Sequence, residues 1–117
     1  DSEPSKIARE MASTVTPTHP VTVMGSGQPS SLDLAVFANG MMIRFLDFND
    51  GYTSRESGHP SDSIAAALSA TESVGGNGKC LIVSTIVAYE TFCRICDTVL
   101  QIGKINLSTI ANLDKRT

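Results

Sequence analysis

The sequence contains no tryptophan and only two tyrosines and four phenylalanines among its 117 residues. It also lacks an apolar run near the roughly 20 residues that a membrane-spanning helix requires. Lysine and arginine are scattered, so no segment could follow a phosphate backbone or an anionic bilayer. These absences predict that neither nucleic acid nor a membrane is a partner.

Cysteine is scarce as well, and its odd count of three gives a disulfide framework little support. The N-terminus is acidic, whereas a signal peptide begins basic and continues apolar. We therefore expect a cytoplasmic protein, or a mitochondrial matrix protein if its source is eukaryotic. Cys93 and Cys96 have the spacing of a metal-binding pair, but their neighbours are apolar and a fourth ligand near Cys80 is missing. The prediction is reduced, unligated cysteines, with Cys93 and Cys96 packed among apolar side chains, and no metal or cofactor.

What remains is ordinary globular composition, with 41% hydrophobic and 18% charged residues and a net charge of −3. A chain of this length suffices for one modest domain. Apolar residues recur at helical spacing in a short segment, 7–15, and in three longer ones, 31–48, 61–73 and 79–98. One brief extended piece is expected at 21–24. The fold prediction is therefore all-α, a partial helical bundle.

The helices at 31–48 and 79–98 are apolar on more than one side. Four helices cover such surfaces poorly, so we expect both helices to expose contiguous apolar surface in the isolated chain. Such surface is typical of contacts with further helices or a partner subunit. Self-association or low solubility is the expected consequence.

Two short segments hold the side chains suited to chemistry. Asp47 and Asp50 fall near the end of one predicted helix, and His59 and Ser61 fall at the start of the next. Pro60 favours extended backbone at the histidine, and free N–H groups at the following helix start would attract an anion. The structural alternative remains open, because Asp50 and Ser61 can be helix caps and Asp47 an ordinary solvated acid.

Several segments together resemble the signature of the MmgE/PrpD family. They are Asn39-Gly40, Arg44-Phe45-Leu46-Asp47-Phe48-Asn49-Asp50, Gly58-His59-Pro60-Ser61-Asp62-Ser63, Glu72 before the glycine-rich turn, and Tyr89-Glu90-Thr91-Phe92-Cys93-Arg94-Ile95. The resemblance covers about residues 1–98, whereas the tail 99–117 diverges. It implies that residues 1–117 form part of a large helical domain, which the family combines with a smaller α/β lid, usually in homodimers.

The resemblance also implies the site. Asp47 and His59 match active-site positions of the family and are the predicted catalytic residues, while Asp50 and Ser61 are predicted to bind substrate. The implied substrate is a small tricarboxylate, with no metal or cofactor. His59 would act as base or acid, and Asp47 would orient the histidine or a substrate hydroxyl. We therefore expect Asp47 and His59 to approach each other across the loop 50–58 and to face a common cleft.

The loop before His59 is long, which is more similar to the 2-methylcitrate dehydratases than to the cis-aconitate decarboxylases. This implies a hydro-lyase that converts 2-methylcitrate to 2-methyl-aconitate in propionate catabolism. The alternatives are a cis-aconitate decarboxylase-like or other family reaction, and an inactive truncated helical module that only dimerises. Gly51 stands where many family members have a hydroxyl-bearing or small polar residue, and the basic residues and lid of the family are not in this sequence. We expect no turnover by this piece alone.

Overall fold

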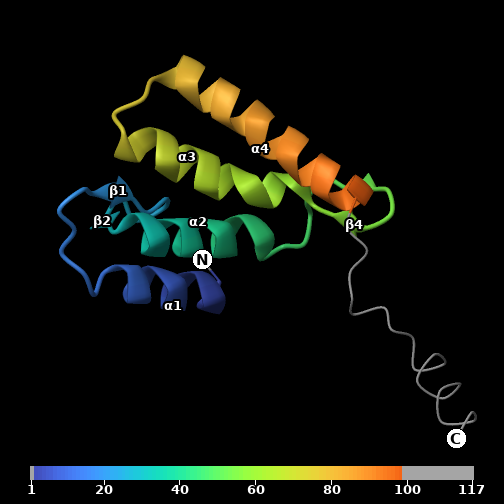
Figure 1. The fold of residues 1–117 in the computed structure, drawn as a ribbon. Helices are drawn as coiled ribbons and strands as arrows, with labels where there is room; N and C mark the ends of the chain where they lie inside the picture. The colour runs from blue at the N-terminus through green and yellow to red at the C-terminus, as the bar shows by residue number, and fades with distance from the viewer. Residues whose placement is uncertain (1, 99–117) are drawn as a thin grey trace, which may run out of the picture.

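The computed structural model describes residues 2–98, which form a stack of helices with two short hairpins (Figure 1). The α-helices are α1 Glu3–Ala12, α2 Leu32–Arg44, α3 Ile64–Ser73 and α4 Gly78–Thr98. A 3-10 turn, η1 Pro60–Ser63, leads into α3. The antiparallel strand pairs are β1 Val21–Thr22 with β2 Pro29–Ser30, and β3 Tyr52–Thr53 with β4 Ser57–Gly58. Val21 lies opposite Ser30, and Tyr52 lies opposite Gly58. The prediction of an all-α fold is confirmed.

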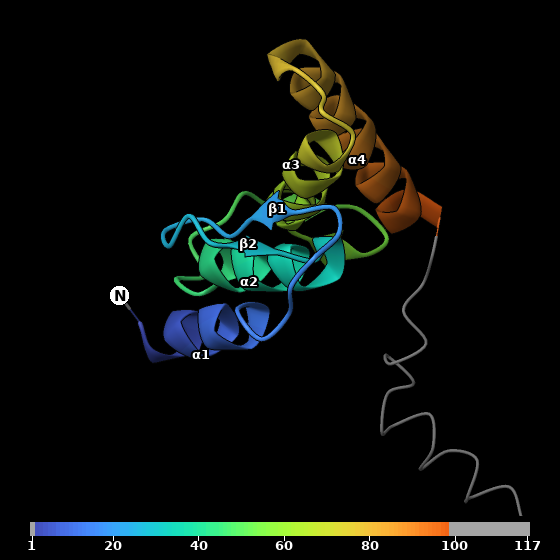
Figure 2. The ribbon, with the colours of Figure 1, turned by 90° about the vertical axis from the view of Figure 1, so that its left-hand side faces the viewer.

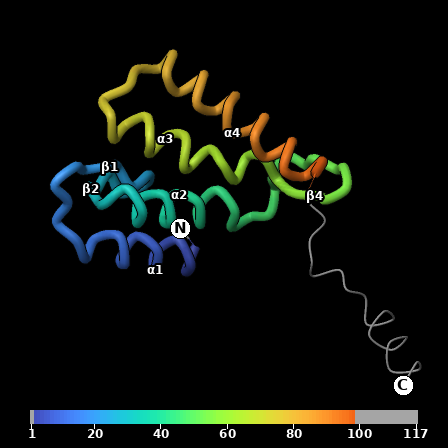
Figure 3. Tube along the Cα trace, in the orientation of Figure 1, coloured from blue at the N-terminus to red at the C-terminus, as the bar shows by residue number. Residues whose placement is uncertain are grey.

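Each helix packs mainly on the next one along the chain and runs back against it (Figure 1). The turned view shows the α3 and α4 pair tilted away from α1 and α2 (Figure 2). The trace places the β1–β2 hairpin at one end of the stack, and the β3–β4 hairpin at the other end beside the C-terminal part of α4 (Figure 3). The stack therefore has two distinct ends.

Glycines and an asparagine make the sharp connection between α3 and α4. Gly75 has a φ of 65°, a left-handed conformation that favours glycine. Its N–H donates to the carbonyl of Glu72, and the N–H of Gly76 donates to that of Thr71, as in a Schellman cap. Asn77 then accepts hydrogen bonds from the first N–H groups of α4. The predicted helix at 79–98 is confirmed, and the cap at Asn77 explains where it begins. An end of this helix beyond residue 98 would lie outside the described residues.

Small residues form the core between α1, α2 and the first hairpin. The buried members are Ala8, Ala12, Val21, Val23, Ala35 and Ala38. Leu34, Met41 and Met42 of α2 are partly buried and pack against this core, whereas Phe37 on the same helix is 44% exposed. Alanines allow the helix backbones to approach closely, and Leu34, Met41 and Met42 pack around them.

The predicted helix at 31–48 is too long. α2 ends at Arg44, and Asp47 adopts a φ of 50°, which no α-helix can continue. The prediction that strand structure is limited to 21–24 is also wrong, because β3 and β4 form a second hairpin. Gly58 permits this hairpin, since a Cβ there would lie 2.6 Å from Cζ of Phe92 on α4. The remaining corrections are small, since the first helix ends at Ala12 and the third begins as a 3-10 turn.

Two residues of the family-like segments fasten β1 to the helices. Asn39 is fully buried on α2, where its Nδ2 donates to the carbonyl of Thr22 at 3.1 Å and its Oδ1 accepts from the N–H of Met24 at 2.8 Å. Glu72 on α3 accepts from the N–H and the hydroxyl of the same Thr22, at 3.0 and 2.5 Å. These two side chains therefore have structural hydrogen bonds at the β1–β2 end.

The outer side of α4 is apolar and open. Ile82, Val83, Ile86 and Val87 are each between 57 and 62% exposed, and they recur at the spacing of one helix face. The expected apolar surface on this helix is confirmed, whereas on α2 the exposed residues include Phe37 but do not form so continuous a stripe. Among residues 2–98, no helix is long and apolar enough to cross a bilayer.

The three thiols are free and differ in exposure. Cys80 is exposed, Cys93 is half-buried and Cys96 is buried. Partial burial raises the pKa of the Cys93 thiol, and nearby acidic groups raise it further. The expected burial is therefore seen for Cys96 and in part for Cys93, while packing among apolar side chains stays a prediction.

Candidate functional site

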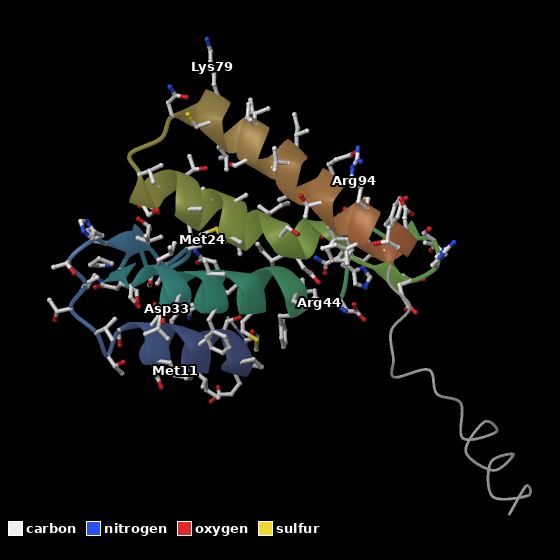
Figure 4. The ribbon with its side chains drawn as sticks, in the orientation of Figure 1. Met11, Met24, Asp33, Arg44, Lys79 and Arg94 are labelled. Atoms are coloured by element: carbon white, nitrogen blue, oxygen red, sulfur yellow. The ribbon has the colours of Figure 1, made fainter. Side chains whose placement is uncertain are left out.

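The predicted site residues gather where α2 ends and η1 begins, at the same end of the stack as the β3–β4 hairpin. Arg44, the last residue of α2, lies beside this junction (Figure 4). Its guanidinium forms an ion pair with Asp47, and its Nε lies 3.7 Å from Oδ2 of Asp62 on η1. One cation thus links the end of α2 to the start of the next helical segment.

Asp47 is exposed and ionised. Its side chain is 73% exposed, and the hydrogen bond and charge of Arg44 hold the pKa of its carboxyl below the usual value of 3.8. The nearby His59 lowers this pKa slightly further. The hydrogen bond of Asp47 nevertheless goes to Arg44. Its left-handed backbone is tolerated better by aspartate than by most other residues, and such local strain is common at functional sites.

His59 is half-buried and is held by the backbone, not by a carboxylate. Its Nδ1 lies 2.5 Å from the main-chain oxygen of Asp50. The backbone at His59 is extended, with φ −117° and ψ 96°, as expected before Pro60. His59 therefore contacts Asp50 directly through a hydrogen bond, whereas it affects Asp47 only through its charge.

Asp50 caps η1 with its side chain. Its Oδ1 accepts from the N–H of Ser61 at 3.0 Å. Partial burial pulls the pKa of the Asp50 carboxyl upward, but hydrogen bonds from Ser61 and from the hydroxyl of Tyr89 outweigh this and lower the pKa. The expectation of free N–H groups at this helix start is wrong for Ser61 and Asp62. The N–H of Ser61 donates to Asp50, and the N–H of Asp62 donates to the carbonyl of His59. The geometry supports the structural alternative for Asp50, because its carboxylate caps η1.

Asn49 and Tyr89 belong to the same cluster, although the sequence prediction did not select them. The Nδ2 of Asn49 donates to the hydroxyl of Ser61 at 3.0 Å, while its Oδ1 is buried without a hydrogen-bond partner among the described residues. Partial burial and the neighbouring Asp50 raise the pKa of the Tyr89 hydroxyl. Asn49 lies between the two predicted aspartates, and Tyr89 lies in a family-like segment. Their position in the family-like segments was the signal in the sequence that could have identified them as members of the cluster.

The charges of the junction are unbalanced. Asp47, Asp50 and Asp62 supply three carboxylates, and Arg44 supplies the cation that pairs with two of them. The Arg44 guanidinium is thus already engaged by carboxylates of the chain, and the hydrogen bond that it donates to Asp47 raises its pKa. Arg44 is therefore not a spare cation for an anionic ligand.

A separate hollow among the described residues lies elsewhere. It has a volume of about 620 Å³ and opens at the β1–β2 end, where its lining includes Val15, His19, Leu32 and Ser73. We regard the α2–η1 junction as the better site candidate, because a hollow without clustered titratable groups offers little chemistry. No group of three or more potential metal ligands occurs among the described residues.

A comparison with known families identifies the family of the chain. The model of the MmgE/PrpD N-terminal domain matches residues 1–109, so the chain belongs to the MmgE/PrpD family. The predicted limit of the resemblance near residue 98 stays a prediction, and the tail 99–117 lies outside the described residues.

The curated relatives are dehydratases. The 2-methylcitrate dehydratase of Cupriavidus necator is 44% identical over 43 residues, which are 37% of this chain and 9% of the relative. The probable 2-methylcitrate dehydratase of Saccharomyces cerevisiae is 36% identical over 59 residues, or 44% of this chain and 11% of the relative. The chain thus spans about a tenth of the length of these relatives. No solved structure matches the chain.

Proposed function

We propose that this chain supplies part of the active site of a hydro-lyase that dehydrates 2-methylcitrate to 2-methyl-aconitate in propionate catabolism. The observation that carries the proposal is the convergence of Asp47, Asp50 and His59 at the α2–η1 junction. The names of the relatives support the choice of substrate. The substrate would be a small tricarboxylate, handled without metal or cofactor.

The proposed chemistry is elimination of water. A base removes a proton from the carbon next to a carboxylate, the electron pair forms the double bond, and the hydroxyl on the neighbouring carbon leaves with a proton as water. In this proposal His59 takes the proton from the carbon and then gives it to the departing hydroxyl, so the products are the alkene and water. Asp47, ionised beside Arg44, orients the substrate hydroxyl, because its own hydrogen bond does not go to His59.

The cluster within residues 2–98 is suited to only part of this task. The developing charge on a substrate carboxylate needs cations or hydrogen-bond donors, and Arg44 is already engaged by Asp47 and Asp62. We propose that the positive groups come from outside the described residues, from the lid or a partner subunit of a complete homodimer. The chain alone would then bind the tricarboxylate poorly and have no turnover.

A second candidate is an inactive helical module that only associates with other chains. The open apolar stripe on α4 favours it, because exposed stripes of this kind are typical of interfaces. Gly51 also favours this candidate, because glycine lacks the side chain with which many family members could anchor substrate at this position. A Cβ at Gly51 would meet nothing within 4 Å, so Gly51→Ser can restore a hydroxyl without a clash.

The test is a chimera in which residues 1–98 replace the matching part of a complete 2-methylcitrate dehydratase. His59→Ala and Asp47→Ala should each lower kcat by about 100-fold or more, the usual range for general acid–base residues. Asp33→Ala is the matched control, since Asp33 is another carboxylate of lowered pKa, located in the first turn of α2. A chimera that associates normally but has no activity even with Gly51→Ser would favour the helical module.

A further inference from the structure

The hydrogen bond of His59 identifies which ring nitrogen carries the proton. Its partner is the main-chain oxygen of Asp50, at 2.5 Å from Nδ1. A carbonyl oxygen has no hydrogen to donate, so Nδ1 must be the donor. In the neutral ring, the lone pair then lies on Nε2.

The carbonyl that accepts this bond is itself held in place. The side chain of Asp50 accepts from the N–H of Ser61, two residues after His59, so residue 50 is joined to the segment on both sides of Pro60. A second connection runs in parallel, since the amide of Asn49 donates to the Ser61 hydroxyl. Pro60 is buried and restricts the backbone between the two attachment points. The orientation of the imidazole is therefore determined by several contacts at once.

From this geometry we infer that Asp50 is the positioning residue of His59. Its carboxylate fastens the segment, and its carbonyl fixes the neutral ring as the Nδ1–H tautomer, which leaves Nε2 as the nitrogen that exchanges a proton. The inference deepens the proposed function. It rests on that function in one respect, namely that the proton exchanged at Nε2 comes from the substrate carbon. It moves Asp50 from the predicted substrate-binding role to a positioning role, and it gives the orienting role predicted for Asp47 to a backbone carbonyl.

The tautomer has a chemical consequence. When the Nε2 lone pair takes a proton from a substrate carbon, the ring becomes an imidazolium and its Nδ1–H bond to Asp50 remains. The negative end of the carbonyl dipole then faces the new positive charge and stabilises it. When Nε2 gives up the proton, the ring returns to the starting tautomer without rotating. Proton exchange at one atom needs no reorganisation of the loop.

Nitrogen NMR on this chain, labelled with ¹⁵N in histidine, tests the inference without substrate. The chain has two histidines, and His19→Gln assigns their signals. At an alkaline pH where both rings are neutral, Nδ1 of His59 should have the shift of a protonated nitrogen and Nε2 that of an unprotonated one. His19 serves as the reference ring for a loop histidine. Shifts showing that His59 is mainly the Nε2–H tautomer, or the same mixture as His19, would overturn the inference.

Variants of residue 50 test the positioning itself. Asp50→Ala keeps the carbonyl but removes the attachment to Ser61, so the tautomer populations of His59 should move toward those of His19. Asp50→Asn keeps a side-chain oxygen that can accept from the Ser61 N–H and should retain the wild-type populations. Asp33→Ala is the control and should change nothing. Unchanged populations in Asp50→Ala at wild-type helix content would show that Asp50 does not position the ring.

The two proposals fail separately. An inactive chimera with His59 as the Nδ1–H tautomer would remove the dehydratase proposal and leave the positioning role. An active chimera whose Asp50→Ala variant has normal kcat and unchanged ring shifts would remove the positioning role and leave the dehydratase proposal.

Discussion

The two ends of the helical stack use residues of the same family-like segments in opposite ways. At the β1–β2 end, Asn39 is fully buried and its amide is hydrogen-bonded on both sides. At the α2–η1 junction, Asp47 is mostly exposed and has left-handed backbone, and Asn49 has a buried oxygen without a hydrogen-bond partner among residues 2–98. The Asn39 amide is fully hydrogen-bonded within the chain, whereas the junction has polar groups left available.

This contrast separates structural residues from candidate functional ones. Removing one partner of a buried hydrogen bond leaves the other unsatisfied, at about 1–3 kcal/mol for each group. Substituting exposed residues changes stability little, typically within about 0.5 kcal/mol. We therefore expect the β1–β2 end to dominate the free energy of unfolding, and the junction to dominate activity.

The largest effect on stability is expected for Asn39→Ala. The change leaves the carbonyl of Thr22 and the N–H of Met24 without their partner, so the free energy of unfolding should fall by about 2–4 kcal/mol. Urea denaturation followed by circular dichroism measures it. Asn77→Ala, which removes an exposed cap of α4, should lose only about 1 kcal/mol. Equal losses in the two variants would show that the burial of the Asn39 amide does not determine its contribution to stability.

A smaller loss is expected for Gly58→Ala at the junction. The new Cβ would lie 2.6 Å from Cζ of Phe92, and relieving that clash should destabilise the chain by about 1–2 kcal/mol. Gly51→Ala is the matched control, since nothing lies within 4 Å of a Cβ there. Adding Phe92→Leu to Gly58→Ala should recover part of the stability. Identical denaturation midpoints for Gly58→Ala and Gly51→Ala would show that the hairpin does not depend on this close approach.

The contribution of Asp50 should depend on pH. Its folded pKa is depressed below 3.8, so the stability it adds is present above that value and is lost as the pH falls through the folded pKa. Asp50→Ala should therefore be less stable than wild type at neutral pH, and the difference should shrink in acid. Urea midpoints of both proteins across the acidic range measure this. A difference that stays constant down to the lowest pH would exclude the cap as its cause.

The smallest effect on stability is expected on the outer face of α4. Ile86→Lys places a charge on a residue that is 62% exposed, so the free energy of unfolding should change by less than about 0.5 kcal/mol. Self-association of the chain should nevertheless decrease, as measured by light scattering over a range of concentrations. A wild-type chain that is monomeric at high concentration would show that the stripe is not an association surface.

Local signals in the sequence predicted part of this molecule well. The glycines after α3 and the cap at Asn77 identify the third and fourth helices, because a left-handed residue and a side-chain cap act within a few residues. The end of α2 was not predictable from spacing, since Phe45 and Phe48 continue its apolar pattern. The β3–β4 hairpin depends on the contact between Gly58 and Phe92, far apart in the chain, which no local pattern reveals.

The closeness of the predicted site residues followed from the sequence, whereas their hydrogen bonds did not, and their catalytic and binding roles stay predictions. Asp47, Asp50, His59 and Ser61 do gather at one junction. The partner of His59 is a backbone oxygen, however, and backbone atoms are the same in every residue, so the sequence could not identify it. The pairing of Arg44 with Asp47 had a signal in its i,i+3 spacing, which the prediction did not use.

The most direct test of the difference between the two ends compares His59→Ala and Asn39→Ala in the chimera described above, with kcat and the urea midpoint measured for each variant. His59→Ala should lower kcat by about 100-fold or more with its midpoint nearly unchanged. Asn39→Ala should lower the midpoint, while the fraction that remains folded keeps a kcat within about threefold of the parent. A His59→Ala chimera with parental kcat, or one whose lost activity is matched by lost folded protein, would contradict the assignment of function to the α2–η1 junction.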